Sequence, residues 1–271
     1  MRRGRNLEVE PLFQEGTPLL IGRDGVKPRA GDLVLFVYAY GRRVRILRVI
    51  GRKTVLADVL EALLLDSLGR RGFEGEVLAE AAEAAASHER RDTFRSDLRD
   101  LFTFTVDPET ACDFDDALSF TAGPDGLVTV YVHIADVSYY VEEGTGLDEE
   151  ALRRGTSVYV PTGVEPMLPA LLSSGVCSLQ PGEDRKAVTV EADVASDGRV
   201  KRVVFYRSLL RSDRRLTYEE LEERFRGGGP ADRELTEALT LGRPLAQRLR
   251  EERFARGSQR ITSTEPEFHY D

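Results

Sequence analysis

Four aspartates lie close together in the segment Asp107-Pro-Glu-Thr-Ala-Cys-Asp113-Phe-Asp115-Asp116. Carboxylates this close raise one another's pKa values unless a cation lies among them. Carboxylate oxygens favour hard divalent cations, so Mg²⁺ or Mn²⁺ is the expected ligand. A zinc site formed by cysteines and histidines is excluded, because the histidines and the two cysteines show no zinc-binding spacing. The segment therefore predicts a divalent-cation site.

The spacing of the four aspartates allows them to share such a site. In an extended segment Asp113 and Asp115 project to one side, Asp116 projects to the other, and Asp107 returns across the turn at Pro108. Two cations about 4 Å apart would activate a water on one side of a phosphodiester and stabilise the leaving 3′ oxygen on the other. A solvated acidic turn and a calcium loop are the alternatives, although the EF-hand spacing is absent and Phe114 indicates anchoring.

Alternating strands and helices surround this segment from residue 101 to the end of the chain. The turn at 123–126 places the strand Leu127 to Val137 after a strand at Ala117 to Thr121. A second hairpin, a capped helix and a longer helix with an internal proline follow. They are predicted at Ala187 to Val194 with Val200 to Leu210, at Thr217 to Gly227, and at Ala231 to Arg256, which Pro244 should kink or divide.

The front of the chain, residues 1–53, reads as a small basic β-barrel. It carries 12 Lys and Arg against 5 Asp and Glu. Short strands are expected at Leu7 to Phe13, Pro18 to Gly22, Leu33 to Tyr40 and Val44 to Ile50. Arg42, Arg43 and Arg45 are candidates for binding phosphates of the substrate, and Phe36, Tyr38 and Tyr40 could stack bases. Aromatics that alternate along a strand also commonly form a core, so both readings stay open.

Residues 54–100 change to a helical period and are predicted to form two helices around Gly69-Arg-Arg-Gly72. A helix-turn-helix is conceivable in this stretch. A helical connector is the preferred interpretation, because the segment is net acidic and a recognition helix should offer basic or amide side chains to the groove.

Composition limits the class of protein. The net charge of −9 argues against a nucleic-acid partner for the chain as a whole, but the basic front precedes an acidic body, which suits an enzyme that binds RNA in one place and cleaves it in another. Two cysteines are too few for a disulfide framework, and no signal peptide or membrane span is visible. We expect a cytoplasmic protein with no membrane role and no obligate protein partner.

The aspartate segment also resembles a known signature. T-V-D-P-E-T-A-C-D-F-D-D-A-L-S at 105–119 is similar to the motif of the ribonuclease II / ribonuclease R family, which carries the RNB catalytic domain. Further family motifs follow in order. They are V-H-I-A-D-V-S-Y-Y-V at 132–141, R-G-T-S-V-Y-V-P at 154–161, P-M-L-P at 166–169, C-S-L-Q-P-G-E-D-R at 177–185 and R-S-D-R-R-L-T-Y-E-E at 211–220.

The resemblance implies both a fold and an activity. The fold is α+β, with an OB-like or cold-shock-like barrel, a helical connector over 54–100 and a mixed α/β RNB domain over 101–271 that looks truncated. The activity is hydrolysis of single-stranded RNA from its 3′ end, processive and Mg²⁺-dependent with two ions, releasing 5′-monophosphate nucleotides. RNA is thus the expected partner.

By position, the resemblance makes Asp107, Asp113, Asp115 and Asp116 the metal and catalytic acids, with Asp115 indispensable for cleavage but not for RNA binding. Tyr159 matches the aromatic that stacks near the 3′-terminal bases, with a strand-core tyrosine as the alternative. His133 and Asp136 lie in a family motif, and we interpret them as satisfied structural groups rather than catalysts.

The chain departs from the family pattern at two places. The second stacking aromatic is replaced near Ser263, and the arginine-rich S-P-I-R-R-Y-like segment and C-terminal barrel expected beyond residue 271 are not in the chain. One alternative is therefore a catalytically impaired or inactive RNA-binding fragment of such an enzyme. A weaker alternative is an Mg²⁺-dependent phosphoesterase acting on small substrates.

Overall fold

A computed structural model of the chain describes residues 2–3, 6–86, 94–161 and 163–261. Its contacts divide the chain into two compact units. The first contains Met1–Glu74 and Arg153–Met167, and the second contains Gly75–Leu152 and Leu168–Asp271. Residues 153–167 therefore pack with the front of the chain, although they follow the aspartate segment in sequence.

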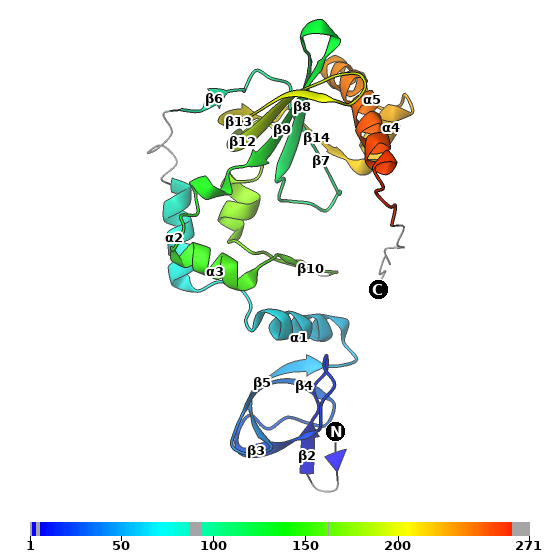
Figure 1. Cartoon of the computed structure of the whole chain (residues 1–271). Helices are drawn as coiled ribbons and strands as arrows, with labels where there is room; N and C mark the ends of the chain where they lie inside the picture. Colours follow the sequence, from blue (N-terminus) through cyan, green and yellow to red (C-terminus); the bar gives the residue numbers. More distant parts are fainter. Residues whose placement is uncertain (1, 4–5, 87–93, 162, 262–271) are drawn as a thin grey trace. The chain divides into compact units, whose positions relative to one another are not determined.

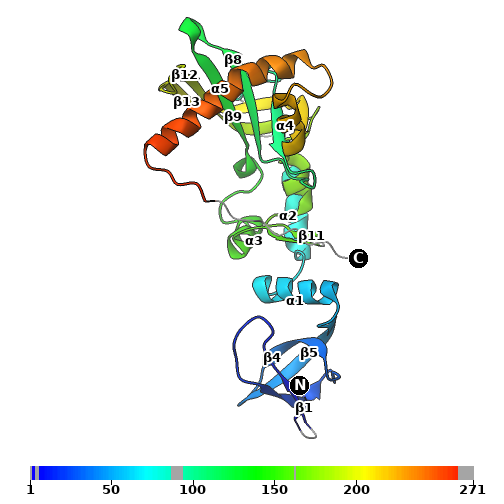
Figure 2. The ribbon, with the colours of Figure 1, turned by 90° about the vertical axis from the view of Figure 1, so that its right-hand side faces the viewer.

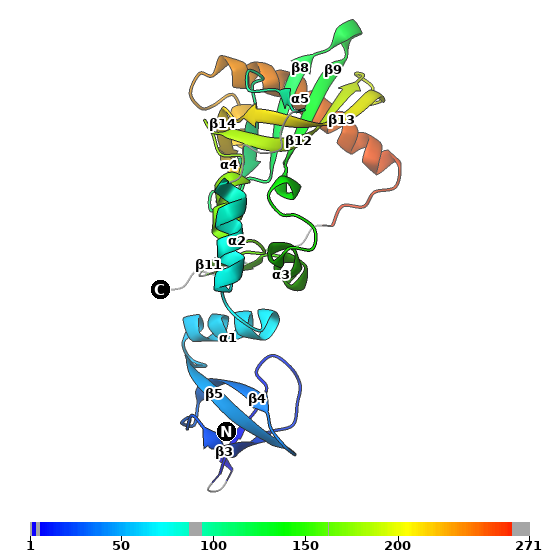
Figure 3. The same ribbon diagram turned by 90° about the vertical axis from the view of Figure 1, so that its left-hand side faces the viewer.

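The first unit contains a five-stranded sheet in the order β1-β2-β3-β5-β4. Its strands are β1 Arg2–Arg3, β2 Asn6–Val9, β3 Leu19–Gly25, β4 Asp32–Tyr38 and β5 Arg43–Arg52. Figures 1 and 3 show how strongly β3, β4 and β5 curl. Val9, Val44 and Ile46 are buried inside the curl, because alternate residues of a strand point to the same face. The predicted small β-rich, basic front end is confirmed as a half-barrel.

The rest of the first unit consists of one helix and one hairpin. Helix α1 runs from Leu56 to Leu68 and ends at Gly69, which adopts a left-handed conformation (φ 73°) and donates its N–H to the Leu65 carbonyl. The hairpin pairs β10, Val158–Val160, with β11, Gly163–Glu165, in antiparallel register.

The second unit contains a seven-stranded mixed sheet in the order β14-β7-β8-β9-β12-β13-β6. Its strands are β6 Ser96–Asp97, β7 Phe104–Asp107, β8 Asp116–Ala122, β9 Val128–Ala135, β12 Asp184–Val194, β13 Val200–Arg211 and β14 Arg214–Thr217. The edge strands β14 and β6 pair in parallel with β7 and β13, and the remaining pairs are antiparallel. Both predicted hairpins, β8–β9 and β12–β13, are confirmed.

The helical segments of this unit are α2 Gly75–Ala86, α3 Gly146–Arg154, the π-helical η3 Leu171–Val176, α4 Tyr218–Phe225 and α5 Arg233–Ala255. Helices α4 and α5 contact the sheet, and α2 contacts η3. The predicted capping box opens α4, because Thr217 accepts from the Glu220 N–H and Glu220 accepts from the Thr217 N–H. Helix α5 is continuous through Pro244, so this proline does not divide it. No helix in the described ranges is long and apolar enough to cross a bilayer.

The core of the second unit lies between α5 and one face of the sheet (Figure 2). Leu235 and Ala238 of α5 pack against Phe104 and Leu216 of the sheet, and farther along the helix Leu245 packs against Val194. This apolar layer fixes β7, β8 and β14, the strands that carry the aspartate segment and its neighbours. The expected mixed α/β body is thereby confirmed.

Candidate active site

The aspartate loop, residues 107–116, joins two neighbouring antiparallel strands of the seven-stranded sheet (Figure 1). Asp107 is the last residue of β7 and Asp116 the first of β8, and the strands pair at Phe104 and Leu118. Adjacent antiparallel strands meet at the end where their connection lies, so the loop brings Asp107 back toward Asp116. The sheet thus gathers the predicted acids at one end of two strands.

Ser178 holds the loop from one side. Its hydroxyl accepts a hydrogen bond from the Phe114 N–H (3.0 Å) and donates to the Cys112 carbonyl (3.4 Å). The N–H of Leu179 donates to the Phe114 carbonyl at 2.8 Å, and the Phe114 ring is buried. Asp113 and Asp115 therefore flank a residue that is fixed by its backbone and by its side chain. The sequence showed the Cys-Ser-Leu motif but gave no sign of this role.

Arg215 holds the loop from the other side. Strand β14 lies parallel to β7 and places Arg215 opposite Thr105. From there the guanidinium donates to the carbonyls of Pro108 and Glu109, both at 2.8 Å, and lies 5.3 Å from the centre of the Phe114 ring. Sequence reasoning did not single out Arg215, because the contact joins residues far apart in the chain.

The carboxylates of the loop interact unfavourably with one another. Burial raises the pKa of Asp107, and the negative charges of Asp116 and Asp113 raise it further, although Thr105 and Arg215 act in the opposite direction. Burial also raises the pKa of Asp115, and the charges of Asp113, Asp116 and Asp107 add to the rise. The arrangement is therefore one that a bound cation would stabilise.

One buried carboxylate oxygen of the loop indicates that the loop can accept a cation. The Oδ2 atom of Asp107 is buried and has no hydrogen-bond partner, a condition that is costly for a carboxylate oxygen. A divalent cation is a suitable partner for such an oxygen. Within the described ranges, however, no group of three or more His, Cys, Asp or Glu side chains is gathered closely enough to hold a metal ion. The prediction of a metal site formed by all four aspartates thus stays a prediction.

The predicted phosphate-binding arginines lie in the first unit. Arg43 and Arg45 are exposed on β5, alternating with the buried Val44 and Ile46. Arg42 is exposed in the preceding turn and donates to the Pro18 carbonyl at 3.3 Å. The strand period thus directs Arg43 and Arg45 outward while their neighbours form the core.

The aromatics of this region separate into two groups. Phe36 packs against the buried core of the half-barrel, as the core interpretation predicts. Tyr38 is 74% exposed and Tyr40 fully exposed, with the Phe36 and Tyr38 rings 5.6 Å apart in an edge-on arrangement. Only Tyr38 and Tyr40 are therefore accessible for stacking on a base.

Tyr159 also belongs to the first unit, whereas the aspartate loop belongs to the second. It lies on β10 directly opposite Val164 of β11, and it is 65% exposed. This exposure does not agree with the alternative of a strand-core tyrosine. The predicted replacement of a second stacking aromatic near Ser263 lies outside the described residues.

His133 and Asp136 are satisfied by hydrogen bonds within the fold, as predicted. His133 is completely buried, with Nε2 3.0 Å from the Ser119 hydroxyl and Nδ1 2.9 Å from the Thr189 hydroxyl. Burial lowers its pKa to about 4. Asp136 accepts from Arg95 at 2.6 Å and from the Ser138 hydroxyl at 2.7 Å. Both side chains therefore have their hydrogen-bonding groups occupied by the fold.

Comparison with known proteins places this site in a family. The RNB domain matches residues 95–271, which includes the whole aspartate loop. Ribonuclease R of Thermotoga maritima is 48% identical over 152 residues, which are 56% of this chain and 21% of that protein. Ribonuclease R of Chlamydia pneumoniae is 38% identical over 213 residues, 78% of this chain and 31% of that protein. The chain thus spans less than a third of either relative.

The fold matches a solved structure as well. The structure of Mycoplasma genitalium RNase R in complex with ribose-methylated single-stranded RNA has a TM-score of 0.82 and 26% sequence identity. The match covers 100% of this chain and 46% of that one. The similarity therefore extends over both units, including the half-barrel that precedes the RNB domain match.

Proposed function

The chain belongs to the RNB-domain family, and we propose that it acts as a hydrolytic exoribonuclease, or as the metal-bearing part of one. The enzyme would need Mg²⁺ and would degrade single-stranded RNA processively from the 3′ end to 5′-monophosphate nucleotides. One observation carries the proposal: the aspartate loop holds mutually repelling carboxylates with the buried, unpartnered Oδ2 of Asp107 among them. Such a site is suited to divalent cations.

In this proposal Asp107, Asp113, Asp115 and Asp116 hold two Mg²⁺ ions, which Mn²⁺ could replace. The bound ions would supply a nucleophilic water and charge stabilisation for the leaving oxygen. The protein's own part is to hold the loop in place. Ser178 and Arg215 do so through hydrogen bonds to the loop backbone.

RNA would contact residues outside the loop. The exposed ring of Tyr159 is assigned to stacking on a base near the 3′ end, because an aromatic face accepts any base. Arg42, Arg43 and Arg45 are assigned to phosphate oxygens farther along the strand. The RNA-bound Mycoplasma genitalium relative supports this choice of substrate class.

The test is cleavage of a 5′-labelled single-stranded oligoribonucleotide in Mg²⁺. We expect a ladder that shortens from the 3′ end, and we expect the Asp115→Asn variant to bind the same RNA and leave it intact. Asp125→Asn is a matched control, since Asp125 is exposed in a turn with φ of 56°, a conformation that asparagine tolerates. Internal cuts, or cleavage by Asp115→Asn at the rate of the unsubstituted protein, would contradict the proposal.

A second candidate function is RNA binding without cleavage. It is favoured by the exposed arginines of the half-barrel, Arg42, Arg43 and Arg45, which could bind phosphates without the aspartate loop. Substituting Arg42, Arg43 and Arg45 together by alanine separates the two functions. The enzyme would retain slow metal-dependent cleavage, whereas the binding protein would lose its only activity.

A further inference from the structure

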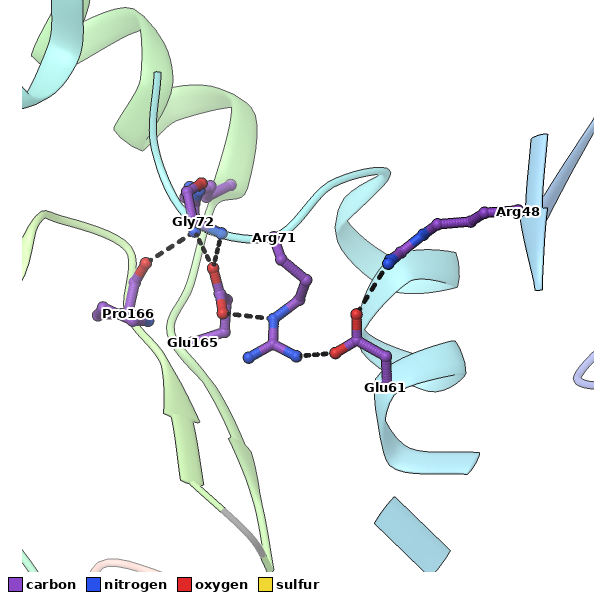
Figure 4. A network of polar contacts seen from close by, with 7 residues as sticks. Arg48, Glu61, Arg71, Gly72, Glu165 and Pro166 are labelled. Atoms are coloured by element: carbon purple, nitrogen blue, oxygen red, sulfur yellow. Dashed lines mark hydrogen bonds and ion pairs between the residues drawn. The ribbon is translucent and has the colours of Figure 1, made fainter. Parts of the chain in front are cut away.

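Glu165 is a buried carboxylate that the proposed reaction does not use. It is the last residue of β11 and is only 5% exposed. Its two oxygens accept from the Arg71 Nε (2.6 Å), the Gly72 N–H (2.6 Å) and the Arg154 guanidinium (3.3 Å). Figure 4 shows Glu165 between the turn that carries Arg71 and Gly72 and the hairpin strand. One side chain thus fastens the β10–β11 hairpin to the turn after α1.

Two further ion pairs connect Arg71 with the half-barrel. The Arg71 guanidinium also pairs with Glu61 of α1, and the second oxygen of Glu61 accepts from Arg48 of β5 at 3.1 Å. Charges of opposite sign therefore alternate from Arg48 to Glu165 (Figure 4). Arg48, which lies on the same strand as Arg43 and Arg45, is occupied by this chain of contacts.

Arg154 closes the base of the hairpin from the other side. Besides Glu165, it donates to the carbonyls of Pro166 (3.0 Å) and Gly72, and its guanidinium lies 3.8 Å from the centre of the Phe73 ring. Its side chain is 4% exposed. Three donors and their partners thus enclose the Glu165 carboxylate in a position from which it has no room to move without breaking them.

We call Glu165, with its donors Arg71, Gly72 and Arg154, the Glu165 anchor. Tyr159 lies on the opposite face of the hairpin from Glu165. In its register Glu165 lies opposite Val158, and Tyr159 lies opposite Val164. Successive residues of a strand point to opposite faces, so the face that carries Glu165 is turned inward and the face that carries Tyr159 outward. The exposed fractions, 5% for Glu165 and 65% for Tyr159, agree with this division.

The charge of Glu165 is needed for the anchor. Burial alone would raise its pKa, but the bonds from Arg71, the Gly72 N–H and Arg154 outweigh burial and hold the pKa below its usual range. A neutral amide at this position would keep one acceptor and turn its N–H donors either toward Arg71 or toward Arg154 and the Gly72 N–H, none of which offers an acceptor there. The isosteric Gln should therefore release the hairpin.

We infer that Glu165 is a positioning residue for RNA binding, which fixes the hairpin so that Tyr159 meets the terminal bases, and that Arg71 and Glu61 tie this hairpin to the basic strand β5. The inference rests on the proposed function, because it takes Tyr159 as the stacking aromatic. Glu165 acts through Tyr159 and touches no RNA itself. Its effect on binding should consequently vanish when Tyr159 is absent.

A double-mutant cycle tests this dependence. Binding of a labelled single-stranded oligoribonucleotide is measured in the Asp115→Asn background, which prevents cleavage. Tyr159→Ala should weaken binding about 5- to 150-fold, the range of one stacked base. Glu165→Gln should weaken it about three- to tenfold, because a released tyrosine loses part of its stacking. The variant with both substitutions should bind as Tyr159→Ala alone.

The outcomes separate the inference from the proposed function. A Tyr159→Ala variant that binds like its parent would overturn the role of Tyr159 and the inference with it. If Tyr159→Ala weakens binding but Glu165→Gln has no effect, or weakens binding equally with and without Tyr159, only the inference is overturned. Glu237→Gln is the charge-matched control, since Glu237 pairs with Arg233 on the exposed surface of α5 and should leave affinity unchanged.

A spectroscopic reading supplements the cycle. The chain contains no tryptophan, so Tyr159→Trp introduces a single fluorescent reporter at the hairpin. Glu165→Gln should lower the fluorescence anisotropy of this reporter while the circular dichroism spectrum stays the same. Arg71→Gln removes the same ion pair from its more exposed partner and replaces Glu165→Gln should that variant not fold. Unchanged anisotropy in the folded variant would contradict the inference.

Discussion

The aspartate loop and the Glu165 anchor treat negative charge in opposite ways. In the loop, carboxylates lie near one another and burial raises the pKa values of Asp107 and Asp115. At the anchor, one buried carboxylate is enclosed by guanidinium and amide donors, and its pKa is lowered. An uncompensated charge can accept a cation, whereas a compensated charge holds structure. In our proposal the same chemical group therefore serves cation binding in one unit and positioning in the other.

Neutralising Glu165 should give the largest change in stability. We expect Glu165→Gln to lower the free energy of unfolding of the first unit by about 3 kcal/mol, because it leaves the buried Arg154 guanidinium without its counter-charge. Urea unfolding followed by circular dichroism measures this change. A loss below about 1 kcal/mol, the range of an exposed ion pair, would show that the anchor is weak.

The buried imidazole of His133 provides a pH test of comparable size. Burial lowers the pKa of His133 from 6.5 to about 4. Between these two pH values the imidazole is protonated in the unfolded chain and neutral in the folded chain. The free energy of unfolding is therefore highest above pH 6.5. It falls by up to about 3 kcal/mol as the pH drops toward 4. The measurement is the free energy of unfolding across this pH window. His133→Gln should flatten the dependence, and an equally steep slope in that variant would contradict the assignment.

Removing Arg215 should disturb the loop without touching a carboxylate. Arg215→Gln breaks the bonds to the Pro108 and Glu109 carbonyls, and we expect it to lower the free energy of unfolding by about 1 to 3 kcal/mol. Cation affinity should fall as well, since the loop backbone loses one of its supports. The neighbouring Arg214→Gln is the control, because the half-exposed Arg214 pairs with Asp232 rather than with the loop. Equal effects of both substitutions would remove the special role of Arg215.

The smallest effect should have the opposite sign. In metal-free buffer Asp115→Asn should raise the free energy of unfolding by about 0.5 to 1 kcal/mol, because it relieves repulsion from three neighbouring carboxylates. Adding Mg²⁺ should stabilise the unsubstituted protein and not this variant. Thermal melting with and without the cation measures both changes. Destabilisation by Asp115→Asn in metal-free buffer would place Asp115 among the structural carboxylates.

The sequence predicted the parts of the molecule that are encoded locally. The alternation of Arg43 and Arg45 with Val44 and Ile46 determines the outward face of β5, and Thr217 with Glu220 determines the start of α4. The aspartate loop was recognisable for the same reason, since its charges are adjacent in the chain. In each case the residues that define the feature lie within a few positions of one another.

The supports of these features were not predictable in the same way. Ser178 and Arg215 reach the loop from far along the chain, and Glu165 reaches Arg71 across 94 residues. Such contacts depend on packing that a single sequence does not display. Phe36 likewise alternates with Tyr38 along β4 as a stacking platform would, but it packs into the core of the half-barrel.

The most direct test of the account is titration of Mn²⁺ or Mg²⁺ into the protein, measured by calorimetry. We predict binding of about two ions to the unsubstituted chain. Asp107→Asn should lose this binding, because Oδ2 of Asp107 is a buried carboxylate oxygen without a partner, while the control Asp125→Asn should retain it. Cation binding of equal affinity and stoichiometry in Asp107→Asn, or none in the unsubstituted protein, would contradict the assignment of the aspartate loop as a cation site.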